Sequence, residues 1–156
     1  MERIEYRNVV DKSDWPRGEW DSEPDKIQWQ DEETGLPCLI VRQHNGYLCG
    51  YVGVTEGHPW HGGSYDRPDV SVHCGLTFAG PCMTNADEAS DICHKTGDGE
   101  PDNVWWLGFD CAHAWDAYPL ESYKNSKAEY RNVAYVTEEC RALARQLHAA
   151  KGTGSA

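Results

Sequence analysis

The residues best suited to chemistry lie together in the second half of the chain. Asp110, His113 and Asp116 are spaced three apart, which places side chains on one face of a helical turn. Two carboxylates and an imidazole in this arrangement suit one divalent metal, Zn²⁺ or Mn²⁺. They equally suit acid–base catalysis by a histidine that a carboxylate orients. We therefore predict these three residues as catalytic groups and as metal ligands.

A second histidine, His73, belongs to the same predicted site. It lies within Asp69–Phe78, where apolar residues alternate with Ser, His, Gly and Thr, the pattern of a β-strand with one buried face. His73 then points away from the core, where it can supply a further ligand or a second base. The competing interpretation of the cluster is structural: Asp110 caps the following turn, and His113 hydrogen-bonds locally.

A long glycine-rich loop over residues 55–68 is a second candidate, since long loops often hold functional residues. Its His-x-x-His spacing is compatible with a metal, but the motif is short and common. The sequence therefore favours a loop that borders the pocket rather than a second metal site. Trp115, beside Asp116 in the main cluster, is predicted to line the same pocket. The predicted pocket residues are His58, Trp60, His61, Tyr65, Asp66 and Trp115.

The seven cysteines give a weaker metal signal. Cys82 and Cys93-His94 lack the closely spaced thiol pairs of structural zinc sites, so zinc is not favoured there. An odd number of cysteines cannot pair completely, and the first residues are charged rather than an apolar signal sequence. Mostly reduced thiols and a cytoplasmic location are the resulting expectation. Four cysteines within apolar patterns are predicted to be buried free thiols: Cys38, Cys49, Cys74 and Cys140.

The elements that must position these residues indicate a small α+β domain. Strand-like segments over 38–42 and 47–54 flank Asn45-Gly46, a pair typical of the type I′ turn of a β-hairpin. The segment 103–110 is apolar on both sides, which indicates a central strand. A short strand over 26–30 and a short helix over 86–93 are also predicted.

The C-terminal segment is predicted to be an amphipathic helix that ends at Gly152. Acidic residues precede basic ones there, the order that suits the helix dipole. The whole is a small, mostly antiparallel sheet with this helix and long loops. It forms a single domain over 1–151, with a loop-rich segment over 1–25 and a disordered tail over 152–156. Apolar residues at spacings of three and four form the helix stripe: Val133, Val136, Cys140, Leu143 and Leu147.

Composition limits the function classes. The 156 residues suffice for one domain with a core, and no stretch approaches the ~20 apolar residues of a membrane span. A net charge of −12 without a basic cluster argues against nucleic acid and anionic membranes as partners. The common nucleotide-binding, zinc-protease, α/β-hydrolase and zinc-deaminase motifs are absent. The partner classes that remain are a cation, a small polar molecule and a basic host protein. The seven Trp and eight Tyr suit the lining of a cleft or an interface.

Several segments together carry a resemblance: YVGV (51–54) with GHP (57–59), VHCGLTF (72–78), WWLGFDCAH (105–113) and the helix around 135–140. Over roughly residues 25–148 the chain resembles a family of small uncharacterised proteins of phage, prophage and bacterial genomes. The resemblance implies a phage-type accessory protein in a bacterial or phage-infected cell, and it adds weight to the predicted site. The family pattern has Gly at the positions of Cys74 and Trp115, and a tryptophan beside Asp116 is bulky enough to reshape or close that site.

These observations favour a small hydrolase, metal-dependent, that acts on a small polar molecule such as a nucleotide derivative. The alternative is a non-catalytic binding protein, which sequesters a small ligand in an aromatic pocket or inhibits a host protein through its acidic surface. A structural or virion-associated protein is the third hypothesis. It ranks last because an inert packing module does not require converging polar residues.

Overall fold

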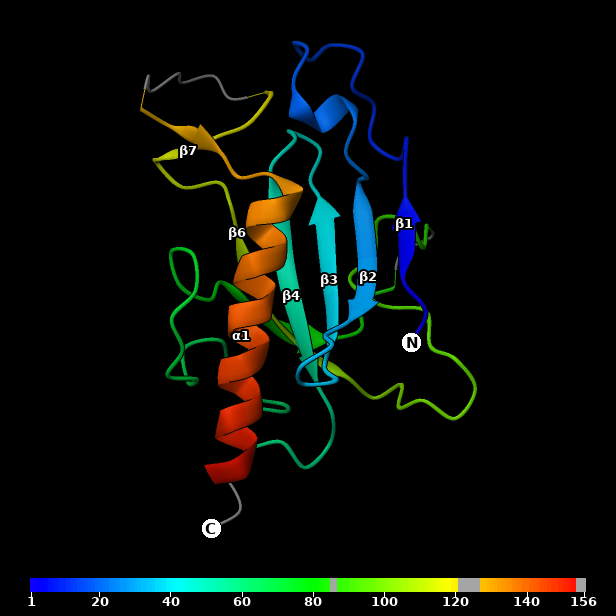
Figure 1. Ribbon diagram of the computed structural model, residues 1–156, viewed down its shortest axis with the longest axis vertical. Helices are drawn as coiled ribbons and strands as arrows, with labels where there is room; N and C mark the ends of the chain where they lie inside the picture. Colours follow the sequence, from blue (N-terminus) through cyan, green and yellow to red (C-terminus); the bar gives the residue numbers. More distant parts are fainter. Residues whose placement is uncertain (85–86, 121–126, 154–156) are drawn as a thin grey trace.

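The computed structural model describes residues 1–84, 87–120 and 127–153. Its centre is an antiparallel sheet in the spatial order β1-β2-β3-β4-β6-β5, and the helix α1 (Val133–Thr153) covers one face (Figure 1). This architecture confirms the predicted α+β class. The six strands are β1 (Ile4–Tyr6), β2 (Lys26–Gln30), β3 (Pro37–Arg42), β4 (Leu48–Val54), β5 (Phe78–Pro81) and β6 (Trp105–Asp110). A 3-10 turn, η1 (Glu19–Asp21), precedes β2, and a parallel pair, β7 (Asp116–Ala117) and β8 (Glu129–Tyr130), lies between β6 and α1 along the chain.

The sheet carries a hydrophobic cluster on each face, and β6 contributes to both. Leu107 and Phe109 belong to the cluster that packs against α1, whereas Val104 and Trp106 belong to the cluster on the opposite face. Because β6 also pairs with β4 on one edge and β5 on the other, it is an interior strand of the sheet with both faces covered. The predicted central strand is therefore confirmed.

The predicted stripe of α1 is also confirmed, since Val136, Cys140, Leu143 and Leu147 have no exposed surface. The helix approaches β4 closely at Gly50, where an added Cβ would lie 2.8 Å from Cys140 Sγ. The Asn132 side chain accepts a hydrogen bond from Tyr135 N at 2.8 Å and caps the first turn. The helix includes Gly152 and ends at Thr153, so the predicted tail began too early. Residues 154–156 of that tail lie outside the described residues.

The hairpin of β3 and β4 is present, but its turn differs from the predicted type I′. Gly46 has φ of 103°, whereas Asn45 has no positive φ. Gly46 N donates to Gln43 O at 3.0 Å, and Gln43 N donates to Tyr47 O at 2.9 Å. These bonds define a type I turn that ends in a glycine bulge, and a three-residue loop of this kind needs left-handed backbone only at its last residue.

The predicted strand over 69–78 is wrong except at its end, because pairing with β6 begins at Phe78. Cys74 and Gly75 have φ of 53° and 83°, and Gly75 N donates to Val72 O at 2.8 Å, so the chain turns there. Val70 and Val72 still pack against the core on the α1 side. The alternation of apolar residues over 69–78 therefore reflects which side chains are buried, not pairing of the segment with another strand.

The helix predicted over 86–93 is wrong over its described part, residues 87–93. These residues form turns and a bridge in which Met83 and Ile92 pair. Residue 86 lies outside the described residues. Asp87 accounts for the turn, since its side chain accepts from Ala89 N at 3.0 Å, a local bond that competes with helix formation.

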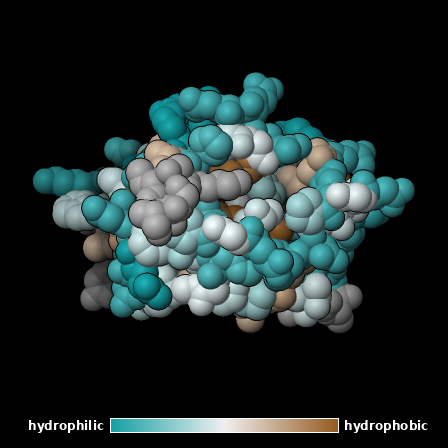
Figure 2. Space-filling model, turned by 90° about the horizontal axis from the view of Figure 1, so that it is seen from below, coloured by the Kyte–Doolittle hydropathy of each residue, from teal (hydrophilic) through white to brown (hydrophobic). Residues whose placement is uncertain are grey.

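The surface seen from below in Figure 2 is mostly hydrophilic, and hydrophobic residues show there mainly in recesses between polar ones. Within the part of the chain that the structure describes, no helix has the length and apolar character needed to cross a membrane.

Candidate functional site

His73 and Asp116 form a hydrogen-bonded pair beside the first turn of α1. His73 Nε2 lies 2.9 Å from Asp116 Oδ2, and His73 Nδ1 lies 2.7 Å from the Tyr135 hydroxyl. A carboxylate only accepts hydrogen bonds, so Nε2–H donates to Asp116. In the neutral imidazole, Nδ1 then accepts from Tyr135. The turn at Cys74, rather than a strand, brings His73 to this position.

Asp116 is fully buried at the start of β7 and accepts three hydrogen bonds. Besides His73, His113 N donates to Oδ2 at 3.0 Å, and Arg131 Nε donates to Oδ1 at 2.9 Å. Burial by itself would raise the pKa of Asp116, but these donors hold that pKa below its ordinary value. Asp116 is therefore a charged, fixed carboxylate at neutral pH.

His113 presents a buried ring nitrogen without a hydrogen-bond partner among the described residues. This atom, Nδ1, lies 3.6 Å from Asp116 Oδ2 and 3.4 Å from Asp110 Oδ1. The ring stands edge-on to His73, with 6.0 Å between centroids. Among the described residues this nitrogen therefore faces two carboxylates at ion-pair distance without a hydrogen bond to either.

Cys74 completes the group. Its prediction as a buried thiol is wrong, because the left-handed turn leaves it exposed; the same prediction is confirmed for Cys38, Cys49 and Cys140. Partial desolvation, and then the charges of Asp116 and Asp110, raise the pKa of the Cys74 thiol. Cys74 is therefore a neutral thiol at neutral pH unless a cation binds beside it.

The four side chains His73, Cys74, His113 and Asp116 each offer one ligand atom, and these atoms all lie within 4.8 Å of one another. Tetrahedral zinc, with bonds of about 2.0–2.3 Å, separates its ligand atoms by about 3.3–3.8 Å. Small side-chain rotations would therefore bring this group to the geometry of a metal site.

Asp110, a predicted ligand, lies next to this group rather than within it. Its Oδ2 accepts a hydrogen bond from Thr77 Oγ1 at 3.0 Å, and its Oδ1 accepts one from Ala112 N at 3.1 Å. The second bond matches the competing prediction that Asp110 caps the following turn. The residues after Asp110 form a bend instead of the assumed helical turn, and that bend brings His113 over Asp116.

The predicted pocket residues of the 55–68 loop do not join this site. His58 is buried and donates from Nε2 to Leu147 O at 2.7 Å, while its Nδ1 accepts from Trp60 N at 3.0 Å. Leu147 follows Tyr135 by twelve residues, which is about 18 Å along the helix axis. The loop therefore lies towards the opposite end of α1 from His73.

The other predicted pocket residues differ in exposure. His61 Nε2 is bonded to Asn103 O at 3.1 Å. Tyr65 and Asp66 are exposed. Trp115 is 57% exposed, so its ring extends largely into solvent and does not close the site beside Asp116.

A surface hollow of about 780 Å³ lies elsewhere, and its lining includes Trp29, Glu33 and Arg141 but no member of the four-residue group. Its lining carries charged side chains, Arg3, Asp31, Glu32, Glu33 and Arg141, but no histidine or cysteine. We therefore place the candidate site by its chemistry rather than by concavity.

The sequence predicted neither Cys74 as a member of the site nor the contacts of Tyr135 and Arg131 with it. Tyr135 directly precedes Val136 and does not belong to the apolar stripe of α1, and Arg131 lies before the first residue of the helix. Arg131 also lies over the Tyr135 ring, 5.0 Å from its centroid. The available signal was their place at the start of α1, where side chains point back over the preceding turn.

Comparisons of the chain with protein-family models, curated proteins and solved structures found no match.

Proposed function

We propose that His73, His113 and Asp116 bind one Zn²⁺ and that the chain is a small zinc-dependent hydrolase. The observation that carries the proposal is the buried Nδ1 of His113, which has no hydrogen-bond partner among the described residues and lies 3.6 Å from the fixed carboxylate of Asp116. Two imidazoles and one carboxylate are a ligand set of catalytic zinc sites. Imidazole and the neighbouring thiol favour zinc over manganese.

The hydrogen bonds around the group support metal binding. If His73 Nε2 held the zinc, the ring proton would lie on Nδ1, which would donate to the Tyr135 oxygen 2.7 Å away. Arg131 remains bonded to the other oxygen of Asp116. Such partners orient the ligands of a metal and tune its affinity.

The fourth metal position would face Cys74 and solvent. If a water rather than the Cys74 thiolate took that position, zinc would supply activation of that water, whose pKa it lowers to about 7. Asp110, beside His113 and partly exposed, is placed to accept the proton. A small polar molecule is the proposed substrate, with nucleotides the first class to screen. The resemblance to phage and prophage proteins supports an accessory role.

Zinc analysis of the oxidised protein tests the proposal. After removal of metals with a chelator and addition of zinc, we expect about one tightly bound zinc per wild-type chain. His113→Ala should lose that zinc and any zinc-dependent turnover in a nucleotide-hydrolysis screen. His44→Ala, which alters an exposed histidine in the β3–β4 turn, is the matched control and should behave like the wild type.

Equal zinc binding by His113→Ala and the wild type would contradict the proposed site. Zinc bound in the proposed way, with the screened molecules recovered unchanged, would instead favour the non-catalytic binding protein.

A further inference from the structure

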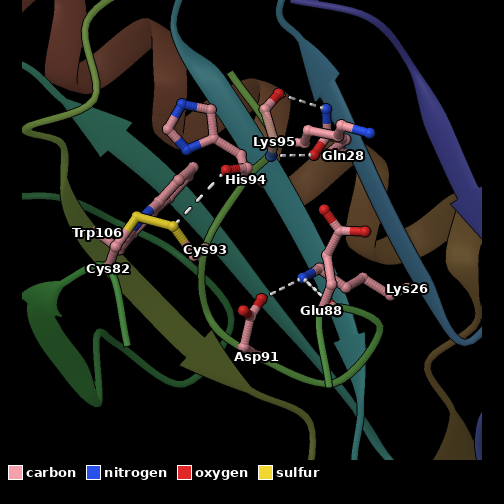
Figure 3. The surroundings of a disulfide bond; sticks show 9 residues. All are labelled: Lys26, Gln28, Cys82, Glu88, Asp91, Cys93, His94, Lys95 and Trp106. Atoms are coloured by element: carbon pink, nitrogen blue, oxygen red, sulfur yellow. Dashed lines mark hydrogen bonds and ion pairs between the residues drawn. A yellow bond between two sulfur atoms is a disulfide. The ribbon is translucent and has the colours of Figure 1, made fainter. Parts of the chain in front are cut away.

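A second group of possible metal ligands lies on the sheet face opposite α1. Cys82 and Cys93 form a disulfide there, and the His94 ring stands over Trp106 with 5.2 Å between centroids (Figure 3). Cys82, Cys93 and His94 offer ligand atoms within 4.8 Å of one another. Zinc was not favoured here from the sequence because the two cysteines are eleven positions apart, and the fold brings them together.

The segment that carries Cys93 is attached to β2 by contacts that do not involve the disulfide. The fully buried Lys26 donates from Nζ to Asp91 Oδ1 and to Glu88 O, both at 2.6 Å. Gln28 accepts from Lys95 N at 2.7 Å and donates to Lys95 O at 3.1 Å. These bonds bracket Cys93 and His94 on both sides (Figure 3).

The position of Cys82 is also fixed by contacts that do not involve the disulfide. It follows β5 directly, and the next residue, Met83, exchanges two backbone hydrogen bonds with Ile92, at 2.9 and 3.2 Å. Cleavage of the sulfur–sulfur bond would therefore leave both thiols close together and close to His94.

The surroundings of the sulfurs suit a metal once the thiols are free. Trp106 Nε1–H donates to Cys82 Sγ at 3.4 Å, and a donor of this kind stabilises a thiolate. His94 Nδ1 is buried and has no hydrogen-bond partner within the described ranges.

We propose that reduced Cys82 and Cys93, together with His94, bind a zinc ion, and that oxidation to the disulfide releases it. A disulfide cannot act as two thiolate ligands, so the two states exclude each other. Release can occur by exchange with a small-molecule disulfide: the two thiolates give up two electrons and form the Cys82–Cys93 bond, while the reagent disulfide leaves as two thiolates and Zn²⁺ dissociates. This site is independent of the one proposed around Asp116.

Cobalt titration of a His113→Ala, Cys74→Ser background tests the proposal, because this background lacks the other site. In the reduced protein, Co²⁺ should give the near-ultraviolet thiolate-to-cobalt absorption of two thiolates per bound ion. Addition of oxidised glutathione should remove that absorption and release the metal to a chromogenic chelator, and mass spectrometry should show the loss of two hydrogens.

His94→Ala provides a second variant that leaves both cysteines in place. It should form the disulfide normally but bind zinc at least about tenfold more weakly when reduced; His44→Ala in the same background should not change the affinity. Circular dichroism of the reduced protein checks that the fold is retained. Cobalt binding without a thiolate band, metal retained after oxidation, or unchanged affinity in His94→Ala would each overturn the proposal.

Discussion

At the scale of single residues, Asp116 is the group on which the candidate site depends. It has no exposed surface, and His73, His113 and Arg131 all donate to it. Truncation of a partner in a buried charged network leaves the remaining donors unsatisfied. The same contacts that could prepare a metal ligand therefore also stabilise the fold.

Asp116→Asn should destabilise the metal-free protein by about 2–4 kcal/mol at pH 7. Because the folded-state pKa of Asp116 is lowered, its stabilising contribution is complete above the unfolded value of about 3.9 and is lost as the pH falls through the lower folded value. Urea unfolding with a chelator should show a difference in unfolding free energy that is present at pH 5 and narrows below about pH 4, as the wild-type carboxylate becomes protonated. Asp66→Asn, in an exposed loop, is the control; a difference that grows in acid would contradict the assignment.

The sequence located His73, His113 and Asp116, which the structure brings together, because polar residues beside apolar strands are conspicuous in a pattern. It could not show how they meet. Asp110 lies beside the group of four ligand atoms rather than within it, and Cys74 faces solvent. Both positions depend on turns, and the spacing of apolar residues does not predict the backbone angles of a turn. Tyr135 and Arg131 join from α1 and its approach, and such contacts follow only from how the helix packs.

At the scale of elements, the strands and helix that bury a face were predicted well, and the connections were not. Strand β6 and helix α1 repeat apolar residues with the period of their own geometry, so pattern and structure agree. Residues 70–77 show the strand period too, but two left-handed residues at Cys74 and Gly75 end any ladder before Phe78. Burial imposes the pattern; hydrogen-bond pairing requires in addition an uninterrupted extended backbone.

The β3–β4 turn allows a test of which residue needs left-handed backbone. Gly46→Ala should destabilise the protein by about 2 kcal/mol or more, since φ is 103° there and a Cβ would lie 2.4 Å from Pro119 Cδ. Asn45→Ala should cost less than about 0.5 kcal/mol, because Asn45 has no positive φ and its side chain is exposed. Chemical denaturation of both variants measures the difference, and similar losses in the two would indicate a type I′ turn instead.

At the scale of the whole molecule, the sheet separates two groups of possible metal ligands. The group around Asp116 lies on the side of α1, and the group around Cys93 lies on the opposite face. A net charge of −12 favours cations at both. The first group keeps its thiol exposed, whereas the thiols of the second are joined, so the two should respond differently to reduction.

Reduction should lower the global stability of the His113→Ala protein without unfolding it. The disulfide closes a loop of eleven positions, and the chain entropy released on cleavage corresponds to about 3 kcal/mol. Neither Cys82 nor Cys93 belongs to the core between α1 and the sheet, so the fold should persist after reduction. Zinc at about one hundred times its dissociation constant should restore about 2.7 kcal/mol to the reduced protein and nothing to the oxidised one.

Urea unfolding with and without a phosphine reductant measures these shifts. In the same His113→Ala background, the Cys82→Ser, Cys93→Ser double variant should respond to neither reductant nor zinc. Equal stabilisation of oxidised and reduced protein by zinc would mean that the metal binds elsewhere. An unchanged stability on reduction would mean that the Lys26 and Gln28 contacts alone constrain the segment around Cys93. The expected pattern instead makes the disulfide and the zinc ion alternative links across the same two cysteines.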